Sequence, residues 1–195
     1  MKSLLVSLAT AAALTVAAPA VAAEYTIDQA HTQAQFTIVH LAISKVHGQI
    51  PIASGTAEIG DNELPSSVNA TLDVTKLDTH DAKRDSDLKG PDFFDAAKYP
   101  TITFVSTKVA GTPAAFTMTG NLTLHGVTKP VTLTGKVEGR VTDGRGRHHI
   151  AYTAATTFDR REFGMNWGNF SGGALIAGYD VTIDLEVDAF TPPAK

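Results

Sequence analysis

Apolar and polar side chains alternate most plainly in FTMTGNLTL, residues 116–124. A period of two places successive side chains on opposite faces of a β-strand, so this stretch predicts a strand with one buried face. The pattern recurs at residues 68–75, 131–138 and 181–189. Threonine, a good strand former that water can solvate, supplies many of the polar positions. The chain is therefore predicted to be all-β.

Turn-forming residues separate the alternating stretches. Such turns stand at residues 60–62, 111–113, 125–130 and 143–146. The Asp-Gly pair in the last of them is a strong hairpin signal, because both central residues of a type I′ turn need positive φ. About eight strands joined mostly by short loops predict antiparallel neighbours.

One stretch departs from this alternation. QFTIVHLAI, residues 35–43, is largely apolar at both sets of alternate positions. A strand of that kind is expected to be buried on both faces, in a closed or double-layered sheet with a covering element outside it. We expect that cover from the helix-like stretch RDSDLKGPDFFDAAKYP, residues 84–100.

Capping signals divide the covering stretch into two short helices. Asp81 or Thr79 is placed to cap the first, which Gly90 ends, and Asp92 is placed to cap a second that runs through Lys98. Each helix is too short to be stable alone, so both must pack on another surface. The phenylalanine pair inside the stretch provides apolar surface for that contact, at the mouth of a barrel if both rings face inward.

The N-terminus has the features of an export signal. Residues 1–23 have a lysine at position 2, an apolar middle rich in Ala and Leu, and small residues at the end. They predict a Sec-type signal peptide cut near Ala23-Glu24, and hence a periplasmic protein. A membrane anchor is the alternative, but the apolar run is short and Pro19 interrupts it. The part after cleavage, residues 24–195, is expected to form one domain.

Composition argues against several classes of protein. The chain of 195 residues has no cysteine, so it cannot form a disulfide or carry a thiol-linked lipid. Its formal net charge is −4 and it has no long basic block, which argues against a nucleic-acid partner. No later segment is apolar and long enough to span a bilayer, so stable membrane insertion is not expected.

The sequence contains none of the common catalytic motifs. It has no cysteine nucleophile, Gly-x-Ser-x-Gly elbow, HExxH pair, P-loop or GxGxxG. Its seven histidines are not spaced as zinc ligands, so neither a catalytic residue nor a metal or cofactor is expected. An acid–base site built from His40 and a carboxylate stays open as an alternative.

Several histidines have local explanations. His148-His149 lies beside a turn, where solvation accounts for it, and His125 precedes a glycine in another turn, where its ring can bond a backbone carbonyl. His40 differs, because it shares a strand face with Phe36 and Ile38. A buried imidazole needs partners for its ring nitrogens, and these are either protein groups or a ligand.

Two charged groups also have two interpretations each. Arg84-Asp85 and Asp159-Arg160-Arg161 are either solvated surface charges or a network at one end of a barrel. In the second case a guanidinium could hold the polar head of a ligand through two acceptors at once.

Large apolar side chains are too many for one thin sheet face. The ordinary explanation is a solid core, and the alternative is a barrel closed around a cavity for one elongated apolar molecule. Gly120 and Gly135 on apolar strand faces would widen such a cavity, although a glycine there can also mark a bulge. The large side chains are Phe36, Phe93, Phe94, Phe104, Phe116, Phe158, Phe163, Phe170, Trp167, Met118 and Met165.

Four longer stretches point to a known family. They are YTIDQAHTQAQFTIVHLAISKVHG from residue 25, THDAKRDSDLKGPDFFDAAKYPTITFVST from residue 79, GNLTLHGVTKPVTL from residue 120 and FDRREFGMNWG from residue 158. In this order they resemble the YceI family of secreted, polyisoprenoid-binding, lipocalin-like proteins. The resemblance covers essentially the whole chain after the signal peptide.

The resemblance implies an extended eight-stranded antiparallel barrel with a short helical crossover, exported to the periplasm. It implies a bound polyisoprenoid or isoprenoid-quinone lipid, no catalysis and no other cofactor, and a homodimer is possible because some relatives dimerise. One departure is Ile50, where the family commonly has phenylalanine, which changes the expected local profile of the lumen. The expected ligand-binding residues are Phe36, Ile38, His40, Arg84, Asp85, Phe93, Phe94, Phe104, Met118, Leu122, Asp159, Phe163 and Trp167.

Two alternative functions use the same cavity. One is an enzyme that acts on the head group of a bound lipid, and the other is a subunit that delivers lipid or quinone to a membrane redox partner. The sequence offers no motif for such a partner.

Overall fold

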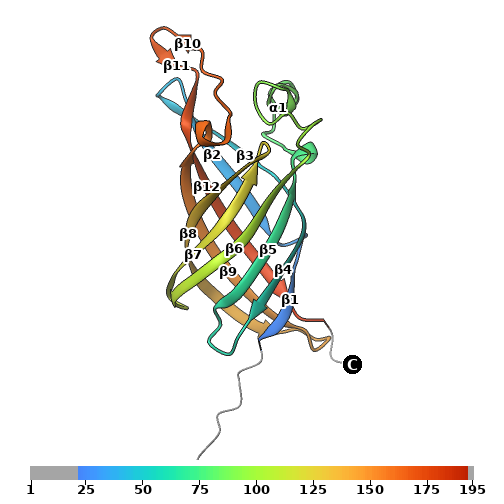
Figure 1. The fold of residues 1–195 in the computed structure, drawn as a ribbon. Coiled ribbons are helices and arrows are strands. Elements are labelled where there is room, and N and C mark those ends of the chain that lie inside the picture. Colours follow the sequence, from blue (N-terminus) through green and yellow to red (C-terminus); the bar gives the residue numbers. More distant parts are fainter. Residues whose placement is uncertain (1–21, 193–195) are drawn as a thin grey trace, which may run out of the picture.

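The structure, a computed structural model, describes residues 22–192. The expected signal peptide thus lies almost entirely outside the described residues. The described chain forms an elongated antiparallel barrel, and helix α1 (Ala82–Lys89) stands at one end of it (Figure 1). Strand β1 (Ala23–Ile27) begins at the opposite end, where β12 (Ala177–Phe190) finishes (Figure 1).

Eight strand positions close the barrel. β12 pairs with β9 on one side and with both β1 and β2 on the other, so β1 and β2 act as two segments of one strand. Because β3 pairs with β2 and β4 pairs with β1, these two also share one position. The predicted eight-stranded antiparallel barrel is confirmed. The remaining strands are β2 (Gln33–His40), β3 (Ser44–Gln49), β4 (Ile52–Ile59), β5 (Pro65–Asp73), β6 (Thr101–Thr112), β7 (Ala115–Leu124), β8 (Val127–Thr142) and β9 (His148–Asp159).

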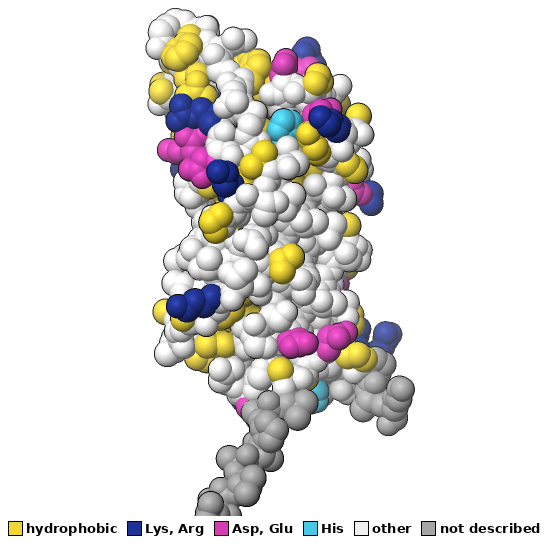
Figure 2. All heavy atoms as spheres, viewed as in Figure 1, with side chains coloured by type: hydrophobic (Ala, Val, Ile, Leu, Met, Phe, Trp, Pro, Cys, Tyr) yellow, Lys and Arg dark blue, Asp and Glu magenta, His cyan; other side chains and the backbone are white. Residues whose placement is uncertain are grey.

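The period-two pattern divides the strands into an inner and an outer face. In β7 the side chains of Phe116, Met118 and Leu124 are buried, while Thr117 between them is exposed. Charged side chains gather toward both ends of the face seen in Figure 2, and its middle is mostly uncharged. The apolar half of each strand therefore faces the barrel interior, as the alternation predicts.

The prediction that the strand at residues 35–43 is buried on both faces is wrong. Val39 on its outer face is 42% exposed, and Ile43 in the following turn is 86% exposed. The expected cover is absent there because the segment that contains α1 lies at the end of the barrel and not outside β2 (Figure 1).

Only the first of the two expected helices forms in the segment between β5 and β6. Asp81 caps α1, since its side chain accepts a hydrogen bond from the backbone N–H of Arg84 at 3.0 Å. Gly90 is the C-cap, as predicted. The prediction of a helix from Asp92 through Lys98 is wrong, because this stretch forms turns.

The turns complete the end of α1. The backbone N–H groups of Phe94 and Ala96 donate to the last carbonyls of α1, at 3.0 Å each. Asp95 adopts a positive φ of 45°, which a continuing helix does not allow. The segment thus satisfies carbonyls that a helix end would otherwise leave unpaired.

Three short elements complete the described chain. The 3-10 helices η1 (Val74–Lys76) and η2 (Arg160–Phe163) follow β5 and β9, and a small hairpin of β10 (Phe170–Ser171) and β11 (Ala174–Leu175) projects beyond the barrel. In Figure 1 this hairpin stands at the same end as α1. None of the helices in residues 22–192 has the length and hydropathy needed to cross a membrane.

Candidate functional site

The barrel encloses a cavity of about 530 Å³. Small-molecule sites typically have volumes of roughly 300–1,000 Å³, so this cavity has the size of a ligand site. Inward-facing aliphatic and aromatic side chains form most of its wall. The interior is therefore hollow, and the alternative of a solid core does not hold.

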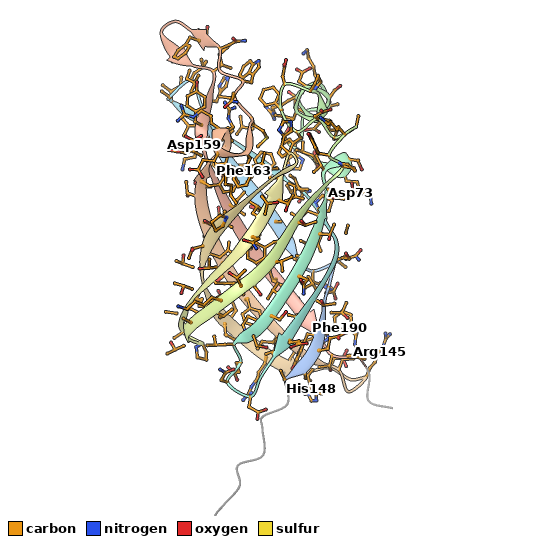
Figure 3. All side chains as sticks on the ribbon, viewed as in Figure 1. Asp73, Arg145, His148, Asp159, Phe163 and Phe190 are labelled. Carbon is orange, nitrogen blue, oxygen red and sulfur yellow. The ribbon has the colours of Figure 1, made fainter. Side chains whose placement is uncertain are left out.

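One end of the cavity is closed by tight packing. Ile59, Ile150 and Ala189 are 4%, 4% and 1% exposed there. The hydroxyl of Tyr152 donates to the carbonyl of Glu63 at 2.8 Å, and burial raises the pKa of Tyr152. We call this the closed end; Figure 3 labels Arg145, His148 and Phe190 near it.

The other end, below α1, carries the charged side chains of the cavity wall. His40, Arg84, Asp87 and Arg160 line the cavity here, and Asp87 is exposed, so this end meets solvent. We call it the open end. The cavity is thus amphiphilic along its length, with an apolar body and polar groups at its open end.

Two aromatic rings meet at the open end. The ring centroids of Phe93 and Trp167 lie 5.0 Å apart, with their planes tilted by 40°. Phe93 comes from the turns after α1, and Trp167 comes from the loop between η2 and β10. Their contact joins two loops across the mouth, and both side chains also line the cavity.

Arg160 is the polar residue that the sequence interpretation undervalued. It is 3% exposed, and its guanidinium donates to the backbone carbonyls of Met165, Trp167, Ala177 and Gly178. Burial lowers the pKa of Arg160. Arg160 therefore holds the loop that carries Trp167 against the start of β12. The only sequence signal for it was its place in a charged triplet, which does not reveal burial.

The Arg84-Asp85 pair organises the start of α1. Arg84 donates to the hydroxyl and to the carbonyl of Thr79, both at 2.8 Å. Asp85 accepts hydrogen bonds from the backbone N–H of Thr79 at 2.8 Å and from its hydroxyl at 2.6 Å. Arg84 also lines the cavity, whereas Asp85 does not.

Two further predicted site residues lie outside the cavity wall. Asp159 caps η2 and accepts a hydrogen bond from the Nε of Arg161 at 3.0 Å, and this hydrogen bond lowers the pKa of Asp159. Phe163 is completely buried, and its ring packs edge-on against Phe158 at 5.1 Å. Figure 3 shows both near the open end. Neither of them nor Asp85 lines the cavity, and all three have structural partners within the protein, so a role for them in ligand binding stays a prediction.

The other predicted site residues do line the cavity. Each lies on an inward position of a strand or at the open end. They are Phe36, Ile38, His40, Arg84, Phe93, Phe94, Phe104, Met118, Leu122 and Trp167. Lining residues that the sequence interpretation did not select include Ile27, Leu88, Tyr152 and Ile176.

Two histidine interpretations have different outcomes. The prediction that the His125 ring bonds a backbone carbonyl is confirmed, since its Nδ1 lies 3.2 Å from the carbonyl oxygen of Phe163. Solvation does not explain His149, whose side chain is only 15% exposed and lies 3.0 Å from a carboxylate oxygen of Asp188.

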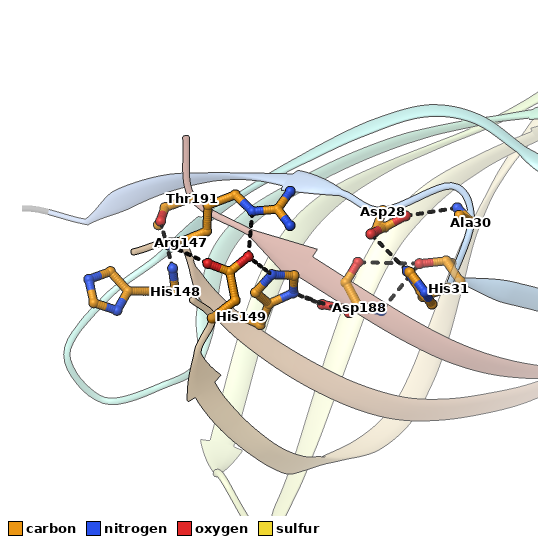
Figure 4. A network of polar contacts seen from close by, with 10 residues as sticks. Asp28, Ala30, His31, Arg147, His148, His149, Asp188 and Thr191 are labelled. Atoms are coloured by element: carbon orange, nitrogen blue, oxygen red, sulfur yellow. Dashed lines mark hydrogen bonds and ion pairs between the residues drawn. The ribbon is translucent and has the colours of Figure 1, made fainter. Parts of the chain in front are cut away.

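A group of polar side chains outside the closed end contains possible metal ligands. Donor atoms of Asp28, His31 and Asp188 all lie within 4.8 Å of one another (Figure 4). His31 Nδ1 lies 2.9 Å from Asp28, and partial burial of Asp28 is outweighed by hydrogen bonds from His31 and Ala30 that lower its pKa. Hydrogen bonding within the group accounts for this arrangement.

A closed antiparallel barrel around an apolar cavity defines the lipocalin-like class of proteins. Within that class, the family model described as YceI-like domain matches residues 25–189 of the chain. The protein YceI of Escherichia coli O157:H7 is 38% identical over 168 residues, which cover 85% of this chain and 88% of the relative. This chain therefore belongs to the YceI family.

Solved structures share the fold. Burkholderia cenocepacia BcnA matches with a TM-score of 0.71 and 22% identity, covering 83% of this chain and 98% of that chain. A domain of Saccharophagus degradans, described as a polyisoprenoid binding domain implicated in plant cell wall breakdown, matches with a TM-score of 0.61 and 14% identity. That match covers 88% of this chain and 99% of the domain.

Proposed function

We propose that this protein binds a long amphiphilic lipid of the polyisoprenoid or isoprenoid-quinone type, and carries or sequesters it without chemical change. The observation that supports this proposal is the cavity of about 530 Å³, which is apolar along its body and polar at its open end. A hydrocarbon tail gains about 0.8 kcal/mol for each methylene that it buries. The head group would then lie near His40 and Arg84.

The comparisons agree with this proposal. The Saccharophagus degradans domain of the same fold is described as polyisoprenoid binding. Because this chain belongs to the YceI family, a polyisoprenoid is the first ligand to test.

The proposed location is the periplasm. It is supported by the signal-peptide pattern of residues 1–23. Mass spectrometry of the protein released from its native host by osmotic shock is expected to find an N-terminus at Glu24. Intact residues 1–23 on a membrane-bound protein would instead support the anchor alternative.

Binding is a better explanation of the cavity than catalysis. Catalysis on the head group would need an acid and a base at the open end. Asp87, the carboxylate that lines the open end together with His40, is paired with Lys83 at 2.9 Å. Turnover of a bound prenyl lipid that disappears in His40→Ala would favour the enzyme alternative. Co-purification with a membrane redox protein would favour the delivery subunit.

Extraction of the purified protein tests the proposal directly. Protein from the native host is treated with organic solvent, and the extract is analysed by mass spectrometry for prenyl lipids. The delipidated protein is then titrated with a long-chain prenyl alcohol and followed by the fluorescence of Trp167, the only tryptophan of the chain. We expect a prenyl lipid in the extract and saturable uptake. No lipid and no uptake would contradict the proposal.

A buried charge in the cavity wall should abolish uptake. Phe104 lines the cavity and is 8% exposed, so the carboxylate of Phe104→Asp would lie in an apolar wall without a partner. The matched control is Val105→Asp, because Val105 is the next residue of β6 and is 46% exposed on the outer face. We expect the control to bind normally. Normal uptake by a folded Phe104→Asp variant would place the lipid elsewhere.

A further inference from the structure

Four glycines on the inner face of the barrel lie directly beneath large side chains of the cavity wall. A β-carbon added to any of them would lie 2.3–2.7 Å from the covering side chain, which is far inside contact distance. The pairs of covering residue and glycine are Phe36 on Gly48, Phe104 on Gly120, Phe116 on Gly135 and Ile27 on Gly55.

The covering side chains come from neighbouring strands. Phe36 of β2 is the direct cross-strand partner of Gly48 in β3, and Phe116 of β7 is the partner of Gly135 in β8. All four covering side chains line the cavity and are 5–8% exposed. Each of them therefore lies along the wall, over the backbone of the next strand, instead of pointing toward the barrel axis.

We propose that these glycines set the width of the cavity and thereby select a methyl-branched prenyl chain over a straight acyl chain. The inference rests on the proposed lipid-binding function. A side chain at any glycine position would displace the covering side chain, and the space beside that side chain is the cavity itself. A narrower cavity excludes the methyl branches, whereas a straight chain in the wide cavity leaves gaps and loses contacts.

Gly48 is the most informative position. The atoms that a β-carbon would meet there belong to the ring of Phe36, at 2.3 Å, and to the methyl group of Thr79, at 2.8 Å. Thr79 is held in place by its hydrogen bonds with Arg84 and Asp85, so the Phe36 ring must move. At Gly120 and Gly135 backbone carbonyl oxygens also lie within 2.7 Å, so an alanine there would strain the strands as well.

The bulge interpretation of Gly120 also holds. The pairing of β6 with β7 shifts register between Ser106 and Lys108, and Ser106 pairs with Gly120. Gly120 can lie both opposite the bulge and beneath the ring of Phe104, because both positions require a close approach of the neighbouring strand.

The test compares two guests on delipidated Gly48→Ala protein: a prenyl alcohol and a straight-chain saturated alcohol of the same carbon number. We expect the affinity for the prenyl alcohol to fall about tenfold or more, while the affinity for the straight chain stays within about twofold. The double variant Phe36→Leu, Gly48→Ala removes the displaced ring and is expected to restore prenyl binding. Gly139→Ala is the matched control, because a β-carbon there meets nothing within 4 Å in the described chain.

Three results would overturn the inference. They are equal affinity of the wild-type protein for both guests, an equal loss of affinity for both guests in Gly48→Ala, and no recovery of the affinity for the prenyl alcohol in the Phe36→Leu, Gly48→Ala double variant. Uptake of neither guest by the wild-type protein would reject the lipid-binding function itself. If Gly48→Ala does not fold, Gly55→Ala with Ile27→Val as its rescue replaces it, because the three atoms nearest to a β-carbon at Gly55 all belong to Ile27.

Discussion

The closed end of the barrel is filled by buried strand side chains, whereas the open end is covered by side chains from loops. At the closed end, Ile150 and Ala189 are almost fully buried inside the barrel. Outside them, the side chains of His149 and Asp188 join β9 to β12 (Figure 4). At the open end, by contrast, Phe93 and Trp167 are only partly buried and come from loops.

This difference indicates that the two ends contribute differently to the stability of the protein and to the access of a lipid to the cavity. Strand ladders and buried side chains hold the closed end, and Val74, Leu77 and Phe163 form part of a second buried cluster toward the open end. The open end depends on loop contacts, and such regions open at lower free energy than the core. Substitutions of buried side chains should therefore act on unfolding, and substitutions in the contact of Phe93 with Trp167 should act on lipid exchange.

The largest effect on stability is expected from Phe116→Ala. Phe116 is 5% exposed and its ring lies 6.1 Å, edge-on, from that of Tyr152. Loss of the ring should lower the free energy of unfolding by about 3–5 kcal/mol in a urea titration, because it leaves a cavity in the packed wall. Thr117→Ala, at the exposed neighbouring position, should change it by less than about 0.5 kcal/mol. Equal effects of the two variants would contradict a tightly packed closed end.

Arg160→Met should have the next largest effect, and it acts at the open end. The carbonyls of Met165, Trp167, Ala177 and Gly178 lose their donor, so the free energy of unfolding should fall by about 3 kcal/mol. Trp167 fluorescence should shift to longer wavelength in the folded protein, because its loop loosens. Arg161→Met is the control, since Arg161 is exposed and donates to Asp159 instead of to the carbonyls of the loop. An unchanged spectrum in Arg160→Met would show that Arg160 does not position the loop.

Trp167→Ala should change the rate of lipid exchange more than the stability of the protein. The ring contacts Phe93 between two loops, so its loss should lower the free energy of unfolding by only about 1 kcal/mol. The same loss should accelerate dissociation of a fluorescent prenyl probe about tenfold, measured by stopped-flow displacement. A large loss of stability with an unchanged dissociation rate would reverse the proposed roles of the two ends.

The smallest effect is expected at the exposed His31. Its hydrogen bond and charge attraction with Asp28 raise the pKa of His31 above 6.5. The stability from this pair is fully present below pH 6.5 and is lost as the pH rises through the raised pKa. The urea midpoint of the wild-type protein should therefore fall slightly from about pH 6 to about pH 9, and His31→Gln should lack that part of the decrease. The same pH dependence in both proteins would exclude the pair as its source.

Local chemistry made most of the strands predictable. Alternation identified the inner faces of β7 and β12, and the Asp143-Gly144 turn marked a hairpin. The cap at Asp81 and the end at Gly90 followed from capping preferences. Closure of the barrel could not be predicted from local patterns, because β12 pairs with both β1 and β2, which are distant from it in the sequence.

Alternation and capping signals did not reveal roles that depend on particular side-chain partners in the folded chain. Phe163 and Asp85 look like cavity residues in sequence, but one packs on Phe158 and the other holds Thr79. Arg160 looks like a surface charge, yet carbonyls from a loop and from β12 surround it. No helix forms after Asp92, where the backbone donors of Phe94 and Ala96 bond carbonyls of α1 and Asp95 has a positive φ.

The most direct test of the lipid-binding account is a crystal structure of the protein loaded with a prenyl alcohol brominated at the end of its tail. The account predicts an anomalous bromine peak inside the barrel near Tyr152, with the alcohol group near His40. A peak outside the barrel, or none at full occupancy of the chain, would contradict it.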